Sequence, residues 1–325
     1  MPPASRPRAV IPDGTDAFPI DDAEIVRRTH GVGPRRLFGA DADEIARLRA
    51  WTAGRGVPAD VADAEAFVLF VGYPRSGHSL VGAMLDAHPE MAVAHELDVL
   101  QFQAAGFDRA QILTLLLENA RRIGRLGRRW DPYDYRVPGG WQGRWSRLRV
   151  VGDKRGGETS RRLAGDPAAL DAFADFIRLP LRCVHVVRHP ADNVATMVRR
   201  TRGRPRGETA DPSDLLSQSL SHYAALARTN RDFLARAGAD RAITVWHEEF
   251  VAEPRRELAR LCRFLGVAVD AAHLDACAGL VAPSPRRSRD ELAWSHGQRA
   301  ALRRIVEGAP FLHRYRDGGS VAGGA

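Results

Sequence analysis

The stretch FVLFVGYPRSGHSLVGAMLDAHPE, residues 67–90, decides the fold class of this chain. Its first six residues, 67–72, form an apolar run that ends in glycine, which is typical of a buried parallel strand. Apolar residues then recur at helical spacing between residues 80 and 88, and Pro89 ends this pattern. A strand, a glycine turn and a helix in this order favour an α/β protein.

The rest of the chain repeats this alternation of strand and helix. Short apolar runs predict four more strands, at 91–95, 148–154, 181–188 and 242–247. Helical patterns occur at 22–53, 108–125, 158–177, 190–203, 213–237, 254–265, 270–280 and 296–307. We therefore expect an α/β fold in which a P-loop-type parallel β-sheet carries helices on both faces, with a helical N-terminal extension.

Composition changes along the chain predict its domain organisation. Residues 1–20 are rich in proline and lack periodicity, so we expect a disordered arm. Residues 21–60 are predicted to form the helical extension, and residues 61–316 a single α/β domain. The Gly-rich end, 317–325, is predicted to be a disordered tail.

Composition and charge narrow the classes of protein. The formal net charge is +8, which favours anionic partners, although the charge density is modest over 325 residues. The three cysteines are far apart in apolar contexts, so we expect them to be buried and reduced. The N-terminus lacks the apolar segment of a secretory signal, and no apolar run is long enough to span a membrane. These features predict a cytoplasmic protein.

The turn after the first strand reads G-x-x-x-x-G-H-S, from Gly72 to Ser79. A nucleotide-hydrolysing P-loop has lysine where this chain has His78. Backbone N–H groups at the start of a helix nevertheless attract anions, and Gly77 lets the backbone approach a ligand closely. A plain strand-to-helix turn is the alternative interpretation.

These residues resemble a known enzyme family. YPRSGHSL, followed by DAHPE and AHELDVL, is similar to the phosphosulfate-binding loop of sulfotransferases that use 3′-phosphoadenosine 5′-phosphosulfate (PAPS). The pattern is most like the tyrosylprotein-type branch, and a bacterial group of uncharacterised sulfotransferases is also similar. A second family element is a strand that ends in Arg188 with a hydroxyl residue, Thr196, eight positions later. The chain departs from the family pattern at His78, where threonine is usual, and at Thr196, where serine is usual.

The resemblance implies a set of donor-binding residues. Arg75 would hold the phosphosulfate in place of the missing P-loop lysine, and Arg188 and Thr196 would bind the 3′-phosphate. The late loop 283–294 looks like the family segment that returns to this phosphate. The residues implied to bind the donor are Arg75, Ser76, Gly77, His78, Ser79, Arg188, Thr196, Arg287 and Ser288.

Sulfuryl transfer needs a base for the acceptor hydroxyl and cations for the charge of the transferring group. Glu96 is the candidate base, because it follows the second strand and lies 21 residues after Arg75, as in the tyrosylprotein-type pattern. His95 is the rival base. Lys154 is the only lysine among 48 basic residues and ends the third strand, so the resemblance makes it the partner of Arg75 in stabilising the transferring group. Asp153 is interpreted as structural.

The acceptor is left open by the sequence. Residues 126–147 have little regular pattern. Within them, residues 128–145 contain three of the six tryptophans and two of the five tyrosines. They either shape the acceptor pocket or attach a loop to the core. The expected function is a PAPS-dependent sulfotransferase that yields 3′-phosphoadenosine 5′-phosphate (PAP), needs no metal, binds no nucleic acid and acts on a small-molecule, sugar, lipid or peptide hydroxyl. One alternative is a P-loop kinase or another nucleotide-binding protein. The other is a non-catalytic protein that binds a sulfated ligand or nucleic acid.

Overall fold

The structure is a computed structural model that describes residues 17–31, 36–130, 133–203 and 211–316. Most of the expected N-terminal arm and all of the expected C-terminal tail lie outside these residues. Within the described part of the chain, no helix is both long enough and apolar enough to cross a membrane.

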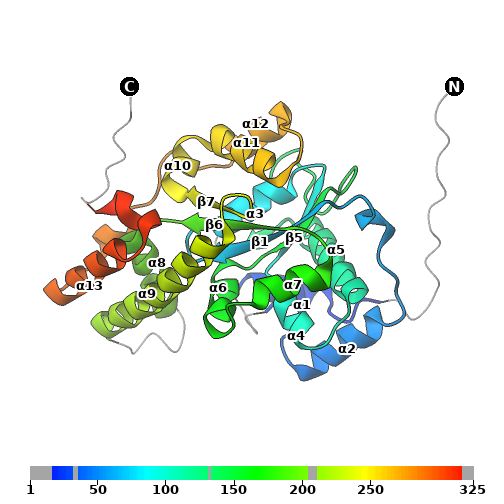
Figure 1. Cartoon of the computed structure of the whole chain (residues 1–325), viewed down its shortest axis with the longest axis horizontal. Helices are drawn as coiled ribbons and strands as arrows, with labels where there is room; N and C mark the ends of the chain where they lie inside the picture. Colours follow the sequence, from blue (N-terminus) through cyan, green and yellow to red (C-terminus); the bar gives the residue numbers. More distant parts are fainter. Residues whose placement is uncertain (1–16, 32–35, 131–132, 204–210, 317–325) are drawn as a thin grey trace.

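The centre of the molecule is a five-stranded parallel sheet with the strand order β2-β5-β1-β6-β7 (Figure 1). The strands are β1 (Ala66–Gly72), β2 (Met91–His95), β5 (Val150–Lys154), β6 (Leu181–Val187) and β7 (Ala242–Trp246). Each pair of neighbours is parallel. The predicted α/β class with a parallel sheet is therefore confirmed.

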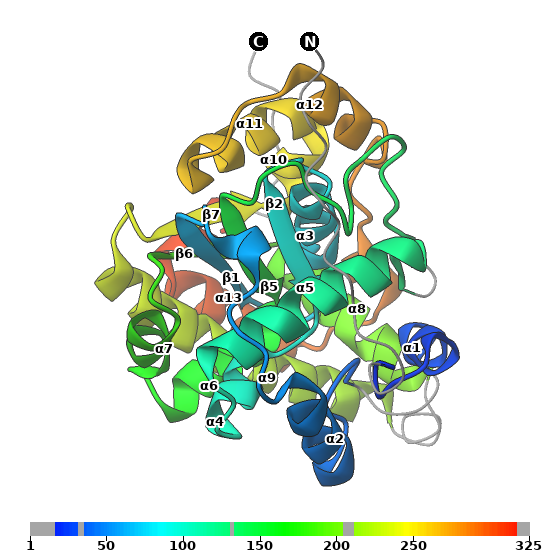
Figure 2. The same cartoon turned by 90° about the vertical axis from the view of Figure 1, so that its right-hand side faces the viewer.

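Helices cover both faces of this sheet, and side chains alternate along the strands to meet them. The helices are α1 (Asp22–Thr29), α2 (Ala42–Thr52), α3 (His78–Asp86), α4 (Val99–Ala104), α5 (Arg109–Arg125), α6 (Gly156–Gly165), α7 (Ala169–Ile177), α8 (Pro190–Arg202), α9 (Pro212–Ala237), α10 (His247–Ala252), α11 (Pro254–Leu265), α12 (Ala271–Ala278) and α13 (His296–Glu307). On β1, Phe67 and Leu69 pack with α5 and α7, whereas Val68 and Phe70 pack with α3 and α11. Figure 2 shows α5 lying across the sheet.

A third apolar core joins α8, α9 and α13 beside the β6–β7 edge. Tyr73 and Tyr223 stack there with their ring centroids 4.2 Å apart, which attaches the turn after β1 to α9. The turn is thus packed from below by aromatic rings. All three cysteines are buried, as expected.

The structure differs from the sequence-based expectations in several places. Residues 126–147, expected to be irregular, contain the antiparallel pair β3 (Arg129–Trp130) and β4 (Tyr133–Asp134). The strand expected from residue 148 begins at Val150. Phe18 and Ile20 are buried, and the Phe18 ring packs against Trp51, so the packed chain begins before residue 21.

Candidate active site

The turn between β1 and α3 has the backbone of an anion cradle. Gly77 is the N-cap of α3 with φ 97°, and Arg75 also has a positive φ of 69°. A Cβ added at Gly77 would lie 2.6 Å from His247 Nδ1. Backbone conformation and space therefore both require glycine at this position, and the N–H groups at the start of α3 face outward.

A cavity of about 980 Å³ opens above this turn at the carboxyl ends of the strands. Its walls come from the end of α1, the β3–β4 pair, the start of α6, the helix α8 and residues 280–286. Of the predicted site residues, those that line it are Arg75, Gly77, His78, Ser79, Glu96, Arg188 and Thr196. Sequence positions more than 120 residues apart thus share one cavity.

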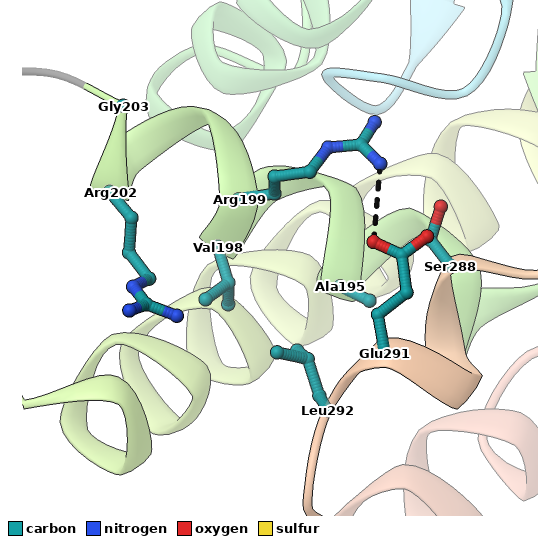
Figure 3. Close-up of a pocket in the computed structure, with 8 residues that line it drawn as sticks. All are labelled: Ala195, Val198, Arg199, Arg202, Gly203, Ser288, Glu291 and Leu292. Carbon is teal, nitrogen blue, oxygen red and sulfur yellow. Dashed lines mark hydrogen bonds and ion pairs between the residues drawn. The ribbon is translucent and has the colours of Figure 1, made fainter.

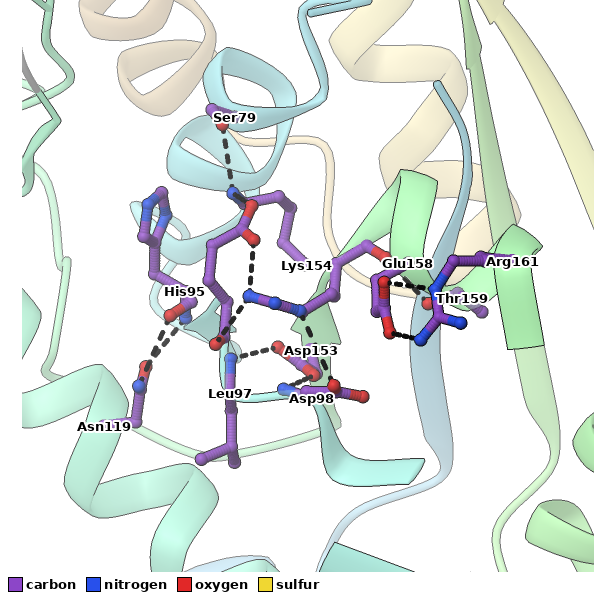
Figure 4. A network of polar contacts seen from close by, with 12 residues as sticks. Ser79, His95, Leu97, Asp98, Asn119, Asp153, Lys154, Glu158, Thr159 and Arg161 are labelled. Atoms are coloured by element: carbon purple, nitrogen blue, oxygen red, sulfur yellow. Dashed lines mark hydrogen bonds and ion pairs between the residues drawn. The ribbon is translucent and has the colours of Figure 1, made fainter. Parts of the chain in front are cut away.

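Glu96 and Lys154 form an ion pair at this cavity. Lys154 Nζ lies 2.5 Å from Glu96 Oε1 and donates a hydrogen bond of 3.0 Å to Ser79 Oγ. The second oxygen, Glu96 Oε2, accepts from Arg155 Nη1 at 2.8 Å. Figure 4 shows the Lys154 side chain reaching Ser79 at the start of α3. The two carboxylate oxygens of Glu96 therefore have different cationic partners.

The charges of this group shift one another's protonation. Burial raises the pKa of Glu96, but the nearby Lys154 and Arg155 outweigh burial and hold this pKa well below its usual range. Burial lowers the pKa of Lys154 to about 8, although Glu96 favours the ammonium form. Glu96 is therefore an ionised carboxylate whose two oxygens are both occupied.

The backbone at Glu96 is held in an unusual conformation. Glu96 and Asp98 have positive φ angles of 57° and 67°, which residues other than glycine rarely adopt. The Asp153 carboxylate accepts hydrogen bonds from the N–H groups of Leu97, Asp98 and Val99, at 3.0, 2.7 and 3.1 Å. Figure 4 shows Asp153 beside the backbone of Leu97 and Asp98, where it has the structural role expected from the sequence. The surrounding contacts thus stabilise the strained turn.

The two histidines of the site differ in position. His78 lines the cavity, and burial followed by the charge of Lys154 lowers its pKa to about 3, so its imidazole is neutral. The ring of the rival base, His95, instead packs against Trp130, with centroids 4.8 Å apart. His95 is 1% exposed, and Asn119 binds its backbone. Between the two candidates for the base, Glu96 is the one at the cavity.

A second cluster of predicted residues forms at the start of α8. Arg188 Nη1 donates to Thr196 Oγ1 at 3.2 Å, and Thr196 Oγ1 lies 3.1 Å from Ser288 Oγ. Arg188 also donates to the backbone carbonyl of Arg286. The structure thus brings Arg188, Thr196 and Ser288 together across more than 90 residues.

Arg287 is the predicted site residue that does not join this cluster. Its side chain is 68% exposed and pairs with Asp290 at 3.2 Å. Neighbouring residues in an irregular segment point in different directions, so Ser288 turns inward while Arg287 turns to solvent. Arg286, which the sequence did not single out, lines the cavity and contacts Arg188 instead.

A smaller cavity of about 480 Å³ lies beside this cluster, between α8 and residues 288–292. Figure 3 shows Arg199 and Glu291 on its rim, joined by an ion pair of 3.4 Å. Because Arg199 also lines the large cavity, this ion pair stands at the border between the two spaces.

The aromatic residues of 128–145 lie in two places, some at the large cavity and some at a contact with another part of the chain. Trp130, Tyr133 and Tyr135 line the large cavity, and the two tyrosine rings stack with centroids 5.8 Å apart. Trp145 lies elsewhere and donates to Asp60 through Nε1 at 2.9 Å. The β3–β4 end of the segment thus faces the cavity, and the later end is attached to the N-terminal part of the chain.

Two residues of the site were missed by sequence reasoning. Arg155 binds Glu96, and its signal was its place next to Lys154 at a strand end. His247 follows β7, packs close to Gly77 and lines the cavity. Its position directly after a strand could have indicated a site residue, since ligands of parallel sheets bind at the carboxyl ends of the strands.

Comparisons with known proteins agree with the motifs. A model of the sulfotransferase family matches residues 181–271, which include Arg188 and Thr196, and this match supports the family resemblance of the sequence. Among solved structures, the sulfotransferase domain of the Synechococcus PCC 7002 olefin synthase is 18% identical, with a TM-score of 0.48, over 78% of this chain and 97% of that one. A mouse sulfotransferase complexed with PAP is 12% identical, with a TM-score of 0.46, over 85% of this chain and 90% of that one.

Proposed function

We propose that this chain, a sulfotransferase by its family match, moves a sulfuryl group from PAPS to an acceptor hydroxyl. One observation carries the proposal. The anion cradle at Gly77, the Glu96 carboxylate that Lys154 binds, and Arg188 and Thr196 of the second cluster all line one cavity. A donor with one anionic group at each end fits two separate anion sites, with the catalytic pair beside the first.

The side chains of the cavity fit such a donor. In the described part of the chain, Ser76 Oγ, His78 Nδ1 and Arg188 Nε are buried without a hydrogen-bond partner. Buried polar atoms are rarely left unpaired, so these atoms are candidates to bind a ligand. Arg75 and the backbone of residues 76–79 would hold the phosphosulfate, and Arg188, Thr196 and Ser288 would hold the 3′-phosphate.

The reaction requires one proton transfer and one exchange of bonds at sulfur. Glu96 takes the proton of the acceptor hydroxyl while the acceptor oxygen forms its bond to sulfur. The bond from sulfur to the bridging phosphate oxygen breaks, and its electron pair leaves with PAP. Arg75 and Lys154 neutralise the charge on the transferring and leaving oxygens.

For Glu96 to act as a base, one of its oxygens must become available. Oε1 is bound by Lys154, whose ammonium lies between Glu96 and Ser79 at the start of α3. An anionic donor in the cradle attracts this ammonium, and Lys154 then exchanges Glu96 for the donor. We therefore propose that donor binding precedes acceptor activation.

The alternative of a P-loop kinase lacks its usual cation. His78 takes the position of the P-loop lysine, and its imidazole is neutral because burial lowers its pKa to about 3. A neutral ring cannot replace an ammonium against the β- and γ-phosphates of a nucleoside triphosphate. The arrangement favours a donor with a 5′-phosphosulfate.

Thermal unfolding with nucleotides tests the proposal. We expect PAP to raise the melting temperature more than ATP with Mg²⁺ or RNA does, because only PAP carries free phosphate monoesters at both the 5′ and the 3′ position of one nucleoside. Adenosine 5′-monophosphate, which differs from PAP only by the missing 3′-phosphate, is the matched control. Stabilisation by ATP with Mg²⁺ but not by PAP would overturn the proposal. A screen of phenol, sugar, lipid and peptide hydroxyls with labelled PAPS then identifies the acceptor.

A further inference from the structure

Three consecutive residues at the end of β5 hold the turn that carries Glu96. Asp153 binds the backbone N–H groups of residues 97–99, and Lys154 binds Glu96 Oε1. Arg155 Nη1 donates to Glu96 Oε2 at 2.8 Å and lies 3.3 Å from the Glu96 carbonyl oxygen. Lys154 also accepts a hydrogen bond from the Glu96 backbone N–H, but through its own carbonyl at 3.1 Å. Arg155 is the one of the three whose side chain contacts both the backbone and the side chain of Glu96.

Arg155 is itself fixed by a second carboxylate. Its Nε lies 3.7 Å from Asp98 Oδ2, and Asp98 accepts two hydrogen bonds from Arg162, at 3.0 and 2.8 Å. Both Glu96 and Asp98 have positive φ angles, so Arg155 spans the two strained positions of the turn. The Arg155 side chain is only 11% exposed, and the residue lines the large cavity.

We propose that Arg155 is a positioning residue for the base: it holds Glu96 Oε2 and the Glu96 carbonyl, so that Oε1 alone turns to the acceptor. This inference rests on the proposed function, in which Glu96 is the base. When Lys154 moves from Glu96 to the donor, Arg155 is the cation that remains on the carboxylate. It keeps Glu96 ionised and prevents the strained turn from relaxing.

Titration of the Glu96 carboxyl tests this role directly. The protein is labelled with ¹³C at glutamate side chains, and Glu96→Gln assigns the signal. We compare the parent with Arg155→Met, which keeps the length of the side chain and removes its charge, and with Arg155→Lys. In Arg155→Met we expect the Glu96 midpoint to rise, with a larger rise when PAP is bound, because Lys154 then no longer compensates.

The matched control is Arg149→Met, which removes an arginine–carboxylate pair at the opposite end of β5. Arg149 lies 2.6 Å from Glu65 at the surface, far from the cavity. We expect no change in the Glu96 titration in this variant. Arg155→Lys restores part of the parent value, because a lysine returns the positive charge but not the planar guanidinium that reaches the carboxylate and the carbonyl from this position.

Kinetics with an acceptor from the screen give the second readout. Arg155→Met is expected to lower kcat by about 10- to 100-fold, the usual effect of a misplaced catalytic group, with little change in the donor KM. The acidic limb of the pH profile moves to higher pH with the Glu96 midpoint. An unchanged Glu96 titration in Arg155→Met, with and without PAP, would overturn the inference. A normal rate in Glu96→Gln would instead overturn the base role and leave the titration result standing.

Discussion

The two ends of the proposed donor site differ in how their cations are paired. At the catalytic end, Lys154 and Arg155 both bind the Glu96 carboxylate. At the anchoring end, Arg188 donates to two neutral oxygens, Thr196 Oγ1 and the Arg286 carbonyl. The nearby carboxylate of Asp192 forms an ion pair with Arg289 and not with Arg188.

This difference indicates different tasks. A guanidinium that binds only neutral oxygens keeps its charge available for a phosphate, so the anchoring end is ready to bind before any rearrangement. An ammonium already paired with a carboxylate must exchange partners, so the catalytic end changes when the donor arrives. Burial lowers the pKa of Arg188, which agrees with a charge that has little compensation.

The largest effect is expected on the transfer rate, from a substitution at the catalytic end that leaves donor binding at the anchoring end intact. Glu96→Gln removes the proposed base but keeps the shape of the side chain. We expect the transfer rate to fall by about 100- to 10,000-fold, the usual contribution of a general base. PAP affinity, measured by calorimetry, should change little or rise, because Lys154 loses its competing partner. A transfer rate near that of the parent would exclude Glu96 as the base.

The second effect concerns binding at the anchoring end. Arg188→Met removes the guanidinium beside Thr196 and Ser288. We expect PAP to bind about 10- to 100-fold more weakly, as for the loss of a charge-assisted hydrogen bond of about 1.5–3 kcal/mol. Adenosine 5′-phosphosulfate, which has no 3′-phosphate, serves as the control ligand and should be affected far less. Equal losses for both ligands would contradict a 3′-phosphate site.

The third effect is a pH dependence that only the catalytic end should show. Burial lowers the pKa of Lys154 to about 8, so its ammonium is present below this pH and lost above it. We expect kcat/KM for the donor to fall as the pH rises through about 8, since this parameter reports the free enzyme. Arg188 keeps its charge throughout. Lys154→Arg should remove the alkaline limb, and an unchanged limb in that variant would assign it to another group.

The smallest effect distinguishes two neighbouring residues of the late loop. Ser288→Ala removes a hydroxyl 3.1 Å from Thr196 Oγ1, so PAP affinity should fall by a few-fold, as for one neutral hydrogen bond of about 1 kcal/mol. Arg287→Ala alters an exposed side chain and should leave the affinity within two-fold, as a surface substitution of about 0.5 kcal/mol or less does. A larger loss in Arg287→Ala, measured in the same calorimetric series, would restore the sequence-based assignment.

The central sheet was predictable because each strand is a short apolar run next to a helical pattern. All five strands appear within two residues of their expected positions. The pair β3–β4 was missed because each strand has only two residues, too few for a period of two to be recognised. The short helices α4 and α10 were missed for a similar reason, since six residues contain fewer than two helical turns.

The site was predictable where it follows strand ends and less so where it depends on side-chain direction. Lys154 ends β5 and Glu96 comes directly after β2, the neighbouring strand, so the parallel sheet brings them together. Arg287 and Ser288 are adjacent in an irregular segment, and their pattern does not tell which one points inward. Arg155 lies one position beyond a strand, where the alternation that orients side chains no longer applies.

The pairing of β2 with β5 places His95 opposite Lys154. Asp153, Lys154 and Arg155 all bind the turn that follows His95. The register between β2 and β5 therefore also sets which of these side chains meets Glu96. A shift of one residue would turn every side chain of β5 to the other face of the sheet and exchange the places of a cation and a carboxylate. Buried valines such as Val93 and Val151 do not contact a substrate. They nevertheless fix the register of the two strands and thereby the relative positions of the catalytic side chains.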